Sequence, residues 1–340
     1  MERQTNSLSD PIAVADSGNP AASQISEGAI AQVAILGAGV WGNALATLAT
    51  QKGHGVRVWS RGGTLSLLDA VADADVIVSA VSMKGVPETI ARLQSLTIPP
   101  DAILVSATKG LDSATRQTAS RLWQTAFPNN PIVVLSGPNL SEEIQQGLPA
   151  ATVVSSENSE AAHQVQRIFS SDRFRVYTNS DPIGTELGGT LKNVIAIAAG
   201  VCDGLNLGTN ARSALITRAL AELIRVGVHL GAKPETFFGL AGLGDLLATC
   251  TSPLSRNYRV GYGLAQGKSL PQILEELHST AEGVNTANVL IDLADREQIA
   301  VPVSYQVYLL LNGKITPQQA VVALMERDLK SETVIRFGNE

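Results

Sequence analysis

The sequence predicts an α/β protein in which a doubly wound parallel sheet is followed by an all-α C-terminal part. Short runs of β-branched residues alternate with helix-like stretches as far as Thr178, and this order is typical of a parallel sheet covered by helices. A glycine-rich turn directly follows the first of these runs. Beyond residue 181 the chain has the pattern of helices alone.

Length and composition favour two domains. The 340 residues exceed the roughly 100 to 200 residues of a typical domain. Only 4% of the residues are aromatic while 44% are hydrophobic, so the core must consist of small aliphatic side chains, which suit a buried parallel sheet. We predict a dinucleotide-binding domain at 29–181 and a helical substrate domain at 182–334. The polar, aperiodic segments 1–28 and 335–340 predict flexible tails.

Charge and residue usage exclude several classes of function. The net charge of −6 argues against a dedicated nucleic-acid binder, and no apolar run approaches the ~20 residues of a membrane span. Cys202 and Cys250 have no CxxC spacing, so we expect buried thiols and a cytoplasmic location. Because the histidines are isolated from one another and from the cysteines, no metal site is expected. They are His54, His163, His229 and His278.

The first predicted strand, Gln32 to Leu36, leads directly into the turn GAGVWG, after which Asn43 to Gln51 has helical character. This strand, GxGxxG and helix order is the signature of a Rossmann-type dinucleotide site. Gly37 permits the tight turn, Gly39 lets backbone amides approach a pyrophosphate, and Gly42 lets the helix pack close to the strand. We therefore predict that Gly37, Gly39, Val40 and Gly42 border a dinucleotide.

The second strand, Val56 to Trp59, ends in Ser60 and Arg61. An NAD-preferring site usually has an acid at this point, whereas an arginine holds the 2′-phosphate of NADP. The sequence therefore predicts NADP or NAD as cofactor, with NADP favoured and Arg61 as its clamp. The alternative is a solvated arginine in a turn.

Further strands are predicted at 75–80, 102–107, 132–135 and 174–178, with helices at 86–96 and 117–126 between them. Ligands of such sheets bind beyond the carboxyl ends of the strands. Lys109 follows one of these strands in a Thr-Lys-Gly turn, where it could reach a phosphate or a carboxylate; the alternative is a surface lysine. The stretch Ser136 to Asn139 follows another strand end.

The segment Gly184 to Leu205 is an apolar helix with Lys192 in its middle. A buried ammonium group either pairs with an acid or has a lowered pKa, and a lowered pKa is what a general acid or base near neutrality requires. Lys192 is therefore a candidate catalytic residue, and the alternative is a lysine that snorkels to the surface. The neighbouring Asn193 could orient a hydroxyl or a carbonyl.

The remaining sequence predicts helices at 213–230, 270–277, 284–298, 304–311 and 317–329. Between the first two lies a glycine-rich polar run, 239–263, which concentrates Asp245, Thr249, Ser255, Arg256 and Asn257. An arginine with neutral donors beside it suits a phosphate, and Asp245 could pair with a lysine. The alternative for this run is a capped helix with a solvated arginine.

These motifs together carry a family resemblance. The stretches GAGVWGNALA, ATKGL, SGPNLSEE, ELGGTLKNV and GLGDLLATCTSPLSRNYRVG closely resemble the bacterial type of NAD(P)-dependent glycerol-3-phosphate dehydrogenase, over about residues 32–329. The resemblance implies NAD(P)H-dependent reduction of dihydroxyacetone phosphate to sn-glycerol 3-phosphate, a precursor of glycerophospholipids. It implies a small phosphorylated substrate, and helical substrate domains of this kind often form dimers.

The resemblance also assigns roles to residues. It implies that Lys192 transfers the proton, with Asn193, Asp245 and Thr249 around it. It implies three further sets of contacts: substrate at Lys109, Gly137 and Asn139; the substrate phosphate at Ser255, Arg256 and Asn257; and the cofactor at Trp41, Arg61, Lys109, Ser141, Arg256 and Glu282.

One segment departs from the family. Members usually carry a longer stretch between the second and third strands, whereas here Ser60 is followed almost at once by a short helix-like segment, Leu65 to Ala72. This shortening borders the adenosine pocket and leaves cofactor preference open. Two other functions stay open from the residues alone: a Rossmann-plus-helical reductase of another small keto or hydroxy acid, and a nucleotide sensor without catalysis.

Overall fold

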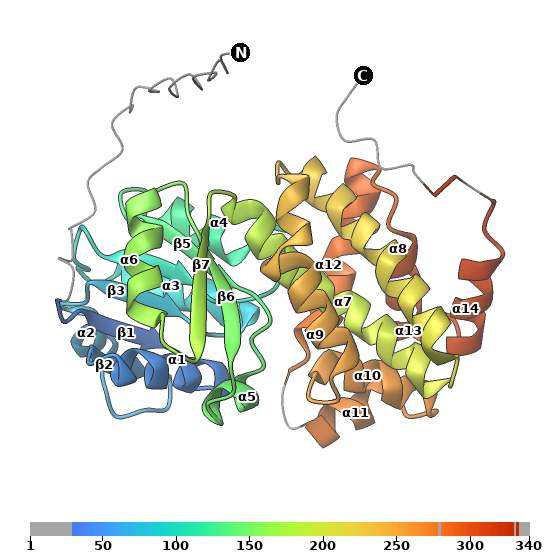
Figure 1. Cartoon of the computed structure of the whole chain (residues 1–340), viewed down its shortest axis with the longest axis horizontal. Coiled ribbons are helices and arrows are strands. Elements are labelled where there is room, and N and C mark those ends of the chain that lie inside the picture. Colours follow the sequence, from blue (N-terminus) through green and yellow to red (C-terminus); the bar gives the residue numbers. More distant parts are fainter. Residues whose placement is uncertain (1–28, 278–279, 330, 333–340) are drawn as a thin grey trace, which may run out of the picture.

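The computed structural model describes residues 29–277, 280–329 and 331–332. The predicted tails at 1–28 and 335–340, and His278, lie outside the described residues. Within the described chain the predicted fold class is confirmed: a strand-rich half is followed by a half made of helices (Figure 1).

Seven strands form one sheet in the order β2-β1-β3-β4-β5-β6-β7. The pairs from β2 to β5 are parallel, β6 is antiparallel to β5, and β7 is parallel to β6. The strands are β1 (Gln32–Leu36), β2 (Gly55–Trp59), β3 (Val76–Ser79), β4 (Ile103–Ser106), β5 (Ile132–Ser136), β6 (Ala150–Ser155) and β7 (Phe174–Asn179).

The sequence analysis missed β6. This strand begins with two alanines, whose preference for strands is weak, so pairing with β5 and β7 rather than local propensity decides its conformation. Because β6 is antiparallel to β5, β7 runs toward the amino end of β5, and its last residue, Asn179, lies level with Val134 in the middle of that strand. The helix that follows β7 therefore starts at the edge of the sheet opposite the carboxyl ends of β1 to β5.

Helices cover both faces of the sheet because the strand residues alternate in direction. Val33 and Ile35 pack with α1 (Val40–Gln51), α5 (Ser141–Gln145) and α6 (Ser159–Phe169). Ala34 and Leu36 pack on the other face with α2 (Leu67–Val71), α3 (Val86–Gln94) and α4 (Ala119–Ala126). A short 3₁₀ turn, η1 (Met83–Gly85), leads into α3.

The second half is organised around α7 (Pro182–Gly204), the yellow-green helix at the centre of Figure 1. Its apolar side chains belong to two buried clusters, one shared with α8, α9, α12 and α13 and the other with α10 to α13. The surrounding elements are α8 (Gly208–His229), η2 (Pro234–Phe238), η3 (Leu240–Gly244), α9 (Asp245–Thr251), α10 (Arg256–Ala265), α11 (Leu270–Leu277), α12 (Glu282–Glu297), α13 (Pro302–Leu311) and α14 (Pro317–Met325).

The polar run 239–263 is mostly helical, as η3, α9 and most of α10. Its glycines permit close packing rather than an open loop. A Cβ atom on Gly261 would lie 1.8 Å from the carbonyl oxygen of Ile197, and one on Gly200 would lie 2.0 Å from that of Tyr258. Therefore α7 and α10 approach each other backbone to backbone.

Candidate active site

The carboxylate of Asp245 joins the two halves of the molecule. Asp245 is the first residue of α9 and is 1% exposed. Its Oδ2 accepts a hydrogen bond of 2.6 Å from Lys109 Nζ, beyond the end of β4, and its Oδ1 accepts one from Lys192 Nζ on α7. Lys192 also donates to Thr249 Oγ1, one turn further along α9. The predicted residues Lys109, Lys192, Asp245 and Thr249 thus form one buried cluster.

Lys192 is 6% exposed, so the snorkelling alternative is wrong. Burial lowers the pKa of Lys192 from 10.5 to about 8, although Asp245 acts in the opposite direction, and the second ammonium group, on Lys109, lowers it further. An amine with this pKa exchanges a proton near physiological pH. Lys192 therefore has both the position and the acidity of a general acid and base.

Lys109 is oriented by the loop after β5. Besides its ion pair with Asp245, its Nζ donates to the carbonyl oxygen of Gly137 at 3.2 Å. Its side chain is 21% exposed, so Lys109 is only partly enclosed by the two halves. The surface-lysine alternative is wrong, and the predicted residues Lys109 and Gly137 are in contact.

Ser136 and Gly189 complete this cluster, and the sequence analysis assigned no role to either. A Cβ atom on Gly189 would lie 2.2 Å from Ser136 Oγ and 3.2 Å from Lys109 Cε, so α7 approaches the end of β5 only because this residue is glycine. The Ser136 hydroxyl is buried without a hydrogen-bond partner. The only sequence signal was the place of Ser136 at a strand end.

Asn139 lies in the same loop. Its Nδ2 donates to Thr152 Oγ1 at 3.0 Å, and its Oδ1 is buried without a partner. Thr152 also donates to the carbonyl oxygen of Ser136 at 2.9 Å, so it orders this loop. No sequence signal identified Thr152, because it belongs to the missed strand β6.

The predicted phosphate cluster forms the first turn of α10. Ser255 Oγ caps this helix by accepting from Tyr258 N at 3.2 Å, while Arg256 is exposed and donates to the carbonyl oxygen of Thr280 at 3.2 Å. Asn257 Oδ1 accepts from Gly283 N at 3.0 Å. The alternative of a capped helix with a solvated arginine therefore describes the structure correctly. It does not conflict with a phosphate site, because the amides of a helix N-terminus and an arginine together attract anions.

Glu282, the first residue of α12, links this turn to the sheet half. Burial raises the pKa of its carboxyl group, which interacts with the backbone of Met83 and lies near the Arg256 guanidinium. Its Oε2 is 3.5 Å from where a Cβ of Gly110 would be. Glu282 thus sits where the two halves face each other.

The first turn of α1 forms an open cradle. Gly37 has a φ of +120°, and a Cβ on Gly42 would lie 1.9 Å from the carbonyl oxygen of Gly37, so both positions require glycine. Gly39 has no atom within 4 Å of its absent Cβ, and Val40 is 57% exposed. No side chain caps α1 and no acid lies in its first turn. Free amides in open space fit a pyrophosphate.

A hollow of about 240 Å³ adjoins this cradle. Its lining includes Gly37, Gly39, Ser60 and Arg61. The exposed Arg61 side chain forms an ion pair of 3.1 Å with Glu88, which the sequence analysis did not consider. Trp41 packs partly buried against the core of the sheet half, and Ser141 begins α5.

Polar contacts of four side chains on α7 and α12 fasten these helices to the sheet half. The buried carboxylate of Glu186 accepts from Ser106 Oγ at 3.0 Å, from Ser120 N at 2.9 Å and from Ser120 Oγ. Thr190 Oγ1 accepts from Gly110 N at 3.1 Å. Two pairs involve α12: Asn285 with the carbonyl oxygen of Leu111, and Arg116 with Asp292.

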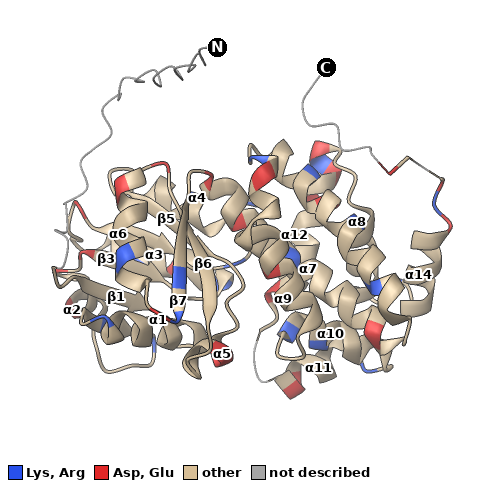
Figure 2. Ribbon diagram, viewed as in Figure 1, with Lys and Arg blue, Asp and Glu red and all other residues tan. Residues whose placement is uncertain are grey.

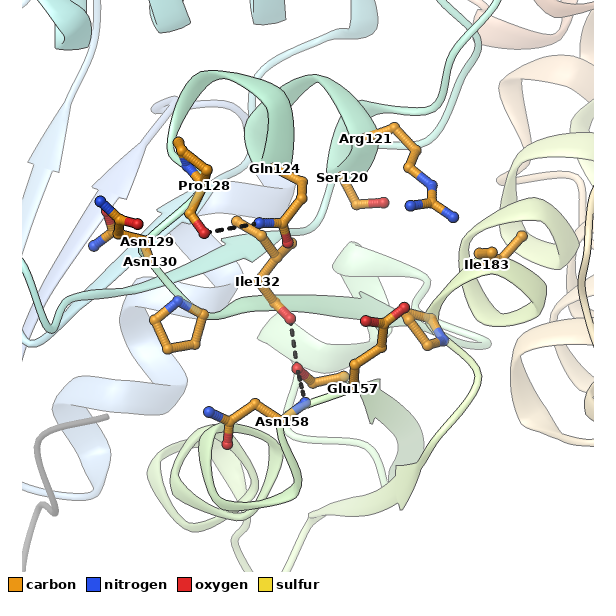
Figure 3. A pocket seen from close by; sticks show the side chains of 13 residues that line it. Ser120, Arg121, Gln124, Pro128, Asn129, Asn130, Ile132, Glu157, Asn158 and Ile183 are labelled. Carbon is orange, nitrogen blue, oxygen red and sulfur yellow. Dashed lines mark hydrogen bonds between the residues drawn. The ribbon is translucent and has the colours of Figure 1, made fainter. Parts of the chain in front are cut away.

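A separate polar pocket of about 210 Å³ lies near the start of α7 (Figure 3). Arg121, Gln124 and Glu157 line it. Ser156 also lines it, and its Oγ donates to the carbonyl oxygen of Ile132. None of the predicted catalytic or binding residues lines this pocket. This pocket is therefore distinct from the Asp245 cluster.

The remaining predictions from the sequence concern thiols, metal sites and membrane spans. Cys202 and Cys250 are buried and free, as predicted. Among the residues that the structure describes, no group of His, Cys, Asp and Glu could hold a metal ion, and no helix is long and apolar enough to cross a bilayer. Figure 2 shows basic and acidic residues mixed over both halves.

Two family descriptions match the chain. The NAD-dependent glycerol-3-phosphate dehydrogenase N-terminus matches residues 32–66 and 62–162, and the corresponding C-terminus matches residues 181–322. The first contains the glycine cradle and Lys109, and the second contains Lys192, Asp245 and the first turn of α10.

Individual relatives agree with these matches. Glycerol-3-phosphate dehydrogenase [NAD(P)+] of Acaryochloris marina is 66% identical over 88% of this chain and 97% of its own length, and that of Synechocystis sp. is 65% identical over 88% and 95%. The crystal structure of glycerol-3-phosphate dehydrogenase from Coxiella burnetii has a TM-score of 0.84, is 36% identical, and covers 88% of this chain and 99% of its own.

Proposed function

Because this chain belongs to the NAD-dependent glycerol-3-phosphate dehydrogenase family, we propose that it reduces dihydroxyacetone phosphate to sn-glycerol 3-phosphate with NADPH or NADH, and catalyses the reverse oxidation. It is an oxidoreductase that acts on a small phosphorylated substrate. The product supplies glycerophospholipid synthesis. A reductase of another small keto or hydroxy acid is not favoured, since the relatives share one activity over most of the chain.

The observation that carries this proposal is the Lys109–Asp245–Lys192 cluster. It places an amine with a pKa of about 8 beside a second ammonium group, on a partly exposed side chain, between the glycine cradle of the sheet half and the first turn of α10. A reduction of a phosphorylated ketone needs a proton donor at the carbonyl and cations that attract the anionic substrate. Lys192 is the proton donor, and Lys109 and Arg256 are the cations.

The nicotinamide, when bound, supplies the hydride that adds to C2 of the ketone. Lys192 donates a proton to the C2 oxygen as that hydride arrives, and in the oxidation it accepts the hydroxyl proton. Asp245 and Thr249 hold the Lys192 amine by accepting its hydrogen bonds, and Asn193 lies next to it. Lys109, Gly137 and Asn139 contact the substrate on the side of the sheet half.

The substrate phosphate binds at the first turn of α10. There Ser255 and Asn257 contribute neutral donors and Arg256 contributes a charged fork, supported by the helix N-terminus. Binding at this remote end orients the carbonyl toward Lys192, which converts binding energy into correct alignment.

Gly37, Gly39, Val40 and Gly42 hold the cofactor pyrophosphate, Arg61 meets its adenosine ribose, and NADP is favoured over NAD. Trp41, Lys109, Ser141, Arg256 and Glu282 border the rest of the cofactor. The proposed domains are 29–181 and 182–334, a division supported by the end of β7 at Asn179 and the start of α7 at Pro182. A cytoplasmic location and a homodimer complete the proposal.

The test compares NADPH oxidation with dihydroxyacetone phosphate and with dihydroxyacetone. Lys192→Ala should reduce kcat by roughly 10²- to 10⁴-fold, the usual contribution of a general acid, and retain cofactor binding. Arg256→Ala should mainly raise KM for the phosphorylated ketone, by about 10- to 100-fold, because a charged hydrogen bond is lost. Arg259→Ala, an exposed arginine on the same helix, is the control. Near-normal kcat in Lys192→Ala, or equal use of both ketones, contradicts the proposal.

A further inference from the structure

Arg61 already has a carboxylate partner. Its Nη1 lies 3.1 Å from Glu88 Oε2 in the first turn of α3, and its side chain is 69% exposed. The other carboxylate oxygen of Glu88 lies 2.8 Å from Arg92 Nη2, one turn further along the same helix. The three side chains therefore form a short chain of alternating charge at the rim of the cofactor hollow, with Arg61 at its inner end.

Among the residues that line this hollow, Arg61 is the one with a charged side chain. NADP differs from NAD only by a phosphate on the adenosine ribose, so this guanidinium is what distinguishes the two. A carboxylate beside it has two effects on that phosphate: it competes for the same guanidinium, and it repels the added negative charge. It leaves a dinucleotide with a free 2′-hydroxyl unaffected.

We propose that Glu88 is a specificity-determining residue that narrows the preference of this site for NADP over NAD by holding Arg61. Arg92 opposes Glu88 by sharing its carboxylate. The inference rests on the proposed function, since it takes Arg61 as the residue that meets the adenosine ribose. It deepens that function, because the pair explains how one site accepts both dinucleotides although no acid follows β2.

The experiment measures, by calorimetry on the full chain, the dissociation constants of adenosine 2′,5′-bisphosphate and of 5′-AMP. Glu88→Gln should tighten the bisphosphate by about 2- to 5-fold, the range expected of an exposed ion pair, and leave 5′-AMP unchanged. Arg92→Gln should weaken the bisphosphate by a similar factor, because Glu88 then binds Arg61 alone. The ratio of kcat/KM for NADPH and NADH should move in the same directions.

Two controls separate this effect from a general change of charge. Asp73→Asn removes the same charge from an ion pair with Arg57 elsewhere in this half, and it should change neither dissociation constant. In an Arg61→Gln background, Glu88→Gln should have no effect on the bisphosphate. An unchanged ratio in Glu88→Gln, or the same tightening without Arg61, overturns the proposal.

The premise has its own readout. If Arg61→Gln binds the bisphosphate as tightly as the unaltered protein does, Arg61 is not the clamp and the inference fails at that point. Reduction of dihydroxyacetone phosphate is measured separately, so this result leaves the proposed activity standing.

Discussion

At the scale of single residues, the proposed chemistry depends on one carboxylate between two ammonium groups. Asp245 is buried, and each of its oxygens accepts from a different lysine. Breaking a buried pair is costly because it leaves an uncompensated charge, so neither lysine is replaceable without affecting the other. The three side chains act as a unit.

The pH dependence of the two reaction directions should mirror each other. Lys192 must be protonated for reduction, so kcat/KM for dihydroxyacetone phosphate should fall above a pKa of about 8. Oxidation needs the neutral amine, so kcat/KM for sn-glycerol 3-phosphate should rise through the same pH. Since the Asp245 carboxylate raises the pKa of Lys192, Asp245→Asn should shift the fall in the reduction profile and the rise in the oxidation profile, the two limbs, to lower pH.

Initial rates between pH 6 and 10 test this directly. Asp292→Asn removes a carboxylate from the surface pair with Arg116 and should leave the limbs in place. Limbs that do not move in Asp245→Asn would show that another group titrates.

Sequence reasoning at this scale reached Lys192 and its partner, Asp245, because an isolated lysine in an apolar helix requires a partner. It did not reach Glu88, which is 27 positions from Arg61 and looks like an ordinary exposed acid of a helix. Ser136 was equally hidden, since its burial arises from contact with α7. Contacts of this kind depend on the packing of distant elements and leave no local pattern.

At the scale of elements, the approach of α7 to α10 fixes the distance between Lys192 and the first turn of α10. The two helices meet through Gly200 and Gly261, where no side chain separates the backbones. Interiors packed this closely respond strongly to an added methyl group.

Gly261→Ala should therefore destabilise the protein by about 1 to 3 kcal/mol, the usual cost of overpacking, or more, because the obstructing atom is a backbone oxygen. Urea denaturation followed by circular dichroism measures the change. Gly62→Ala is the matched control, since nothing lies within 4 Å of its Cβ position. Equal free energies of unfolding for Gly261→Ala and the unaltered protein would mean that α7 and α10 can move apart without loss of stability.

Helices and strands whose apolar residues recur with a clear period were predictable from the sequence, and the others were not. The strands β1 to β5 and β7, and α7, lie within a few residues of their predicted positions, because long apolar runs between glycine turns have few alternatives. Helix α10 contains two glycines, Gly261 and Gly263, which normally disfavour a helix, and here packing against α7 compensates. β6 depended on its neighbours in the sheet.

At the scale of the whole molecule, the sheet half and the helical half are joined by buried polar contacts as well as by apolar packing. One of these groups is the carboxyl group of Glu186, a residue that is 2% exposed. It faces hydroxyl and amide donors from β4 and α4, with no cation among its hydrogen-bond partners. Burial raises the pKa of this carboxyl group, and the hydrogen bonds counteract that rise.

A raised pKa means that the folded state holds the Glu186 proton more tightly than the unfolded state does. The stability that this proton contributes is lost as the pH rises from the ordinary pKa of 4.5 through the raised value. Glu186→Gln, which cannot titrate, should lack this loss. The free energy of unfolding of the unaltered protein, relative to Glu186→Gln, should therefore fall as the pH rises above about 4.5.

Urea denaturation of both proteins at a series of pH values measures this difference. Glu160→Gln is a control of opposite sign, because a hydrogen bond from Arg167 lowers the pKa of Glu160. If the two stability curves of the Glu186 comparison run parallel, the carboxyl group titrates alike in both states.

Because β6 runs antiparallel to β5, helix α7 has to span a fixed distance along the sheet before Lys192 can reach Asp245. Helix α7 starts level with the amino end of β5, and Lys192 follows ten residues later, a rise of about 15 Å. The five residues of β5 span about 16 Å along the sheet. The helix thus carries its lysine across the depth of the sheet and delivers it where β5 ends. One residue inserted or deleted between Pro182 and Lys192 would turn the amine by about 100° away from Asp245, so the number of residues in this stretch is fixed by the position of the amine.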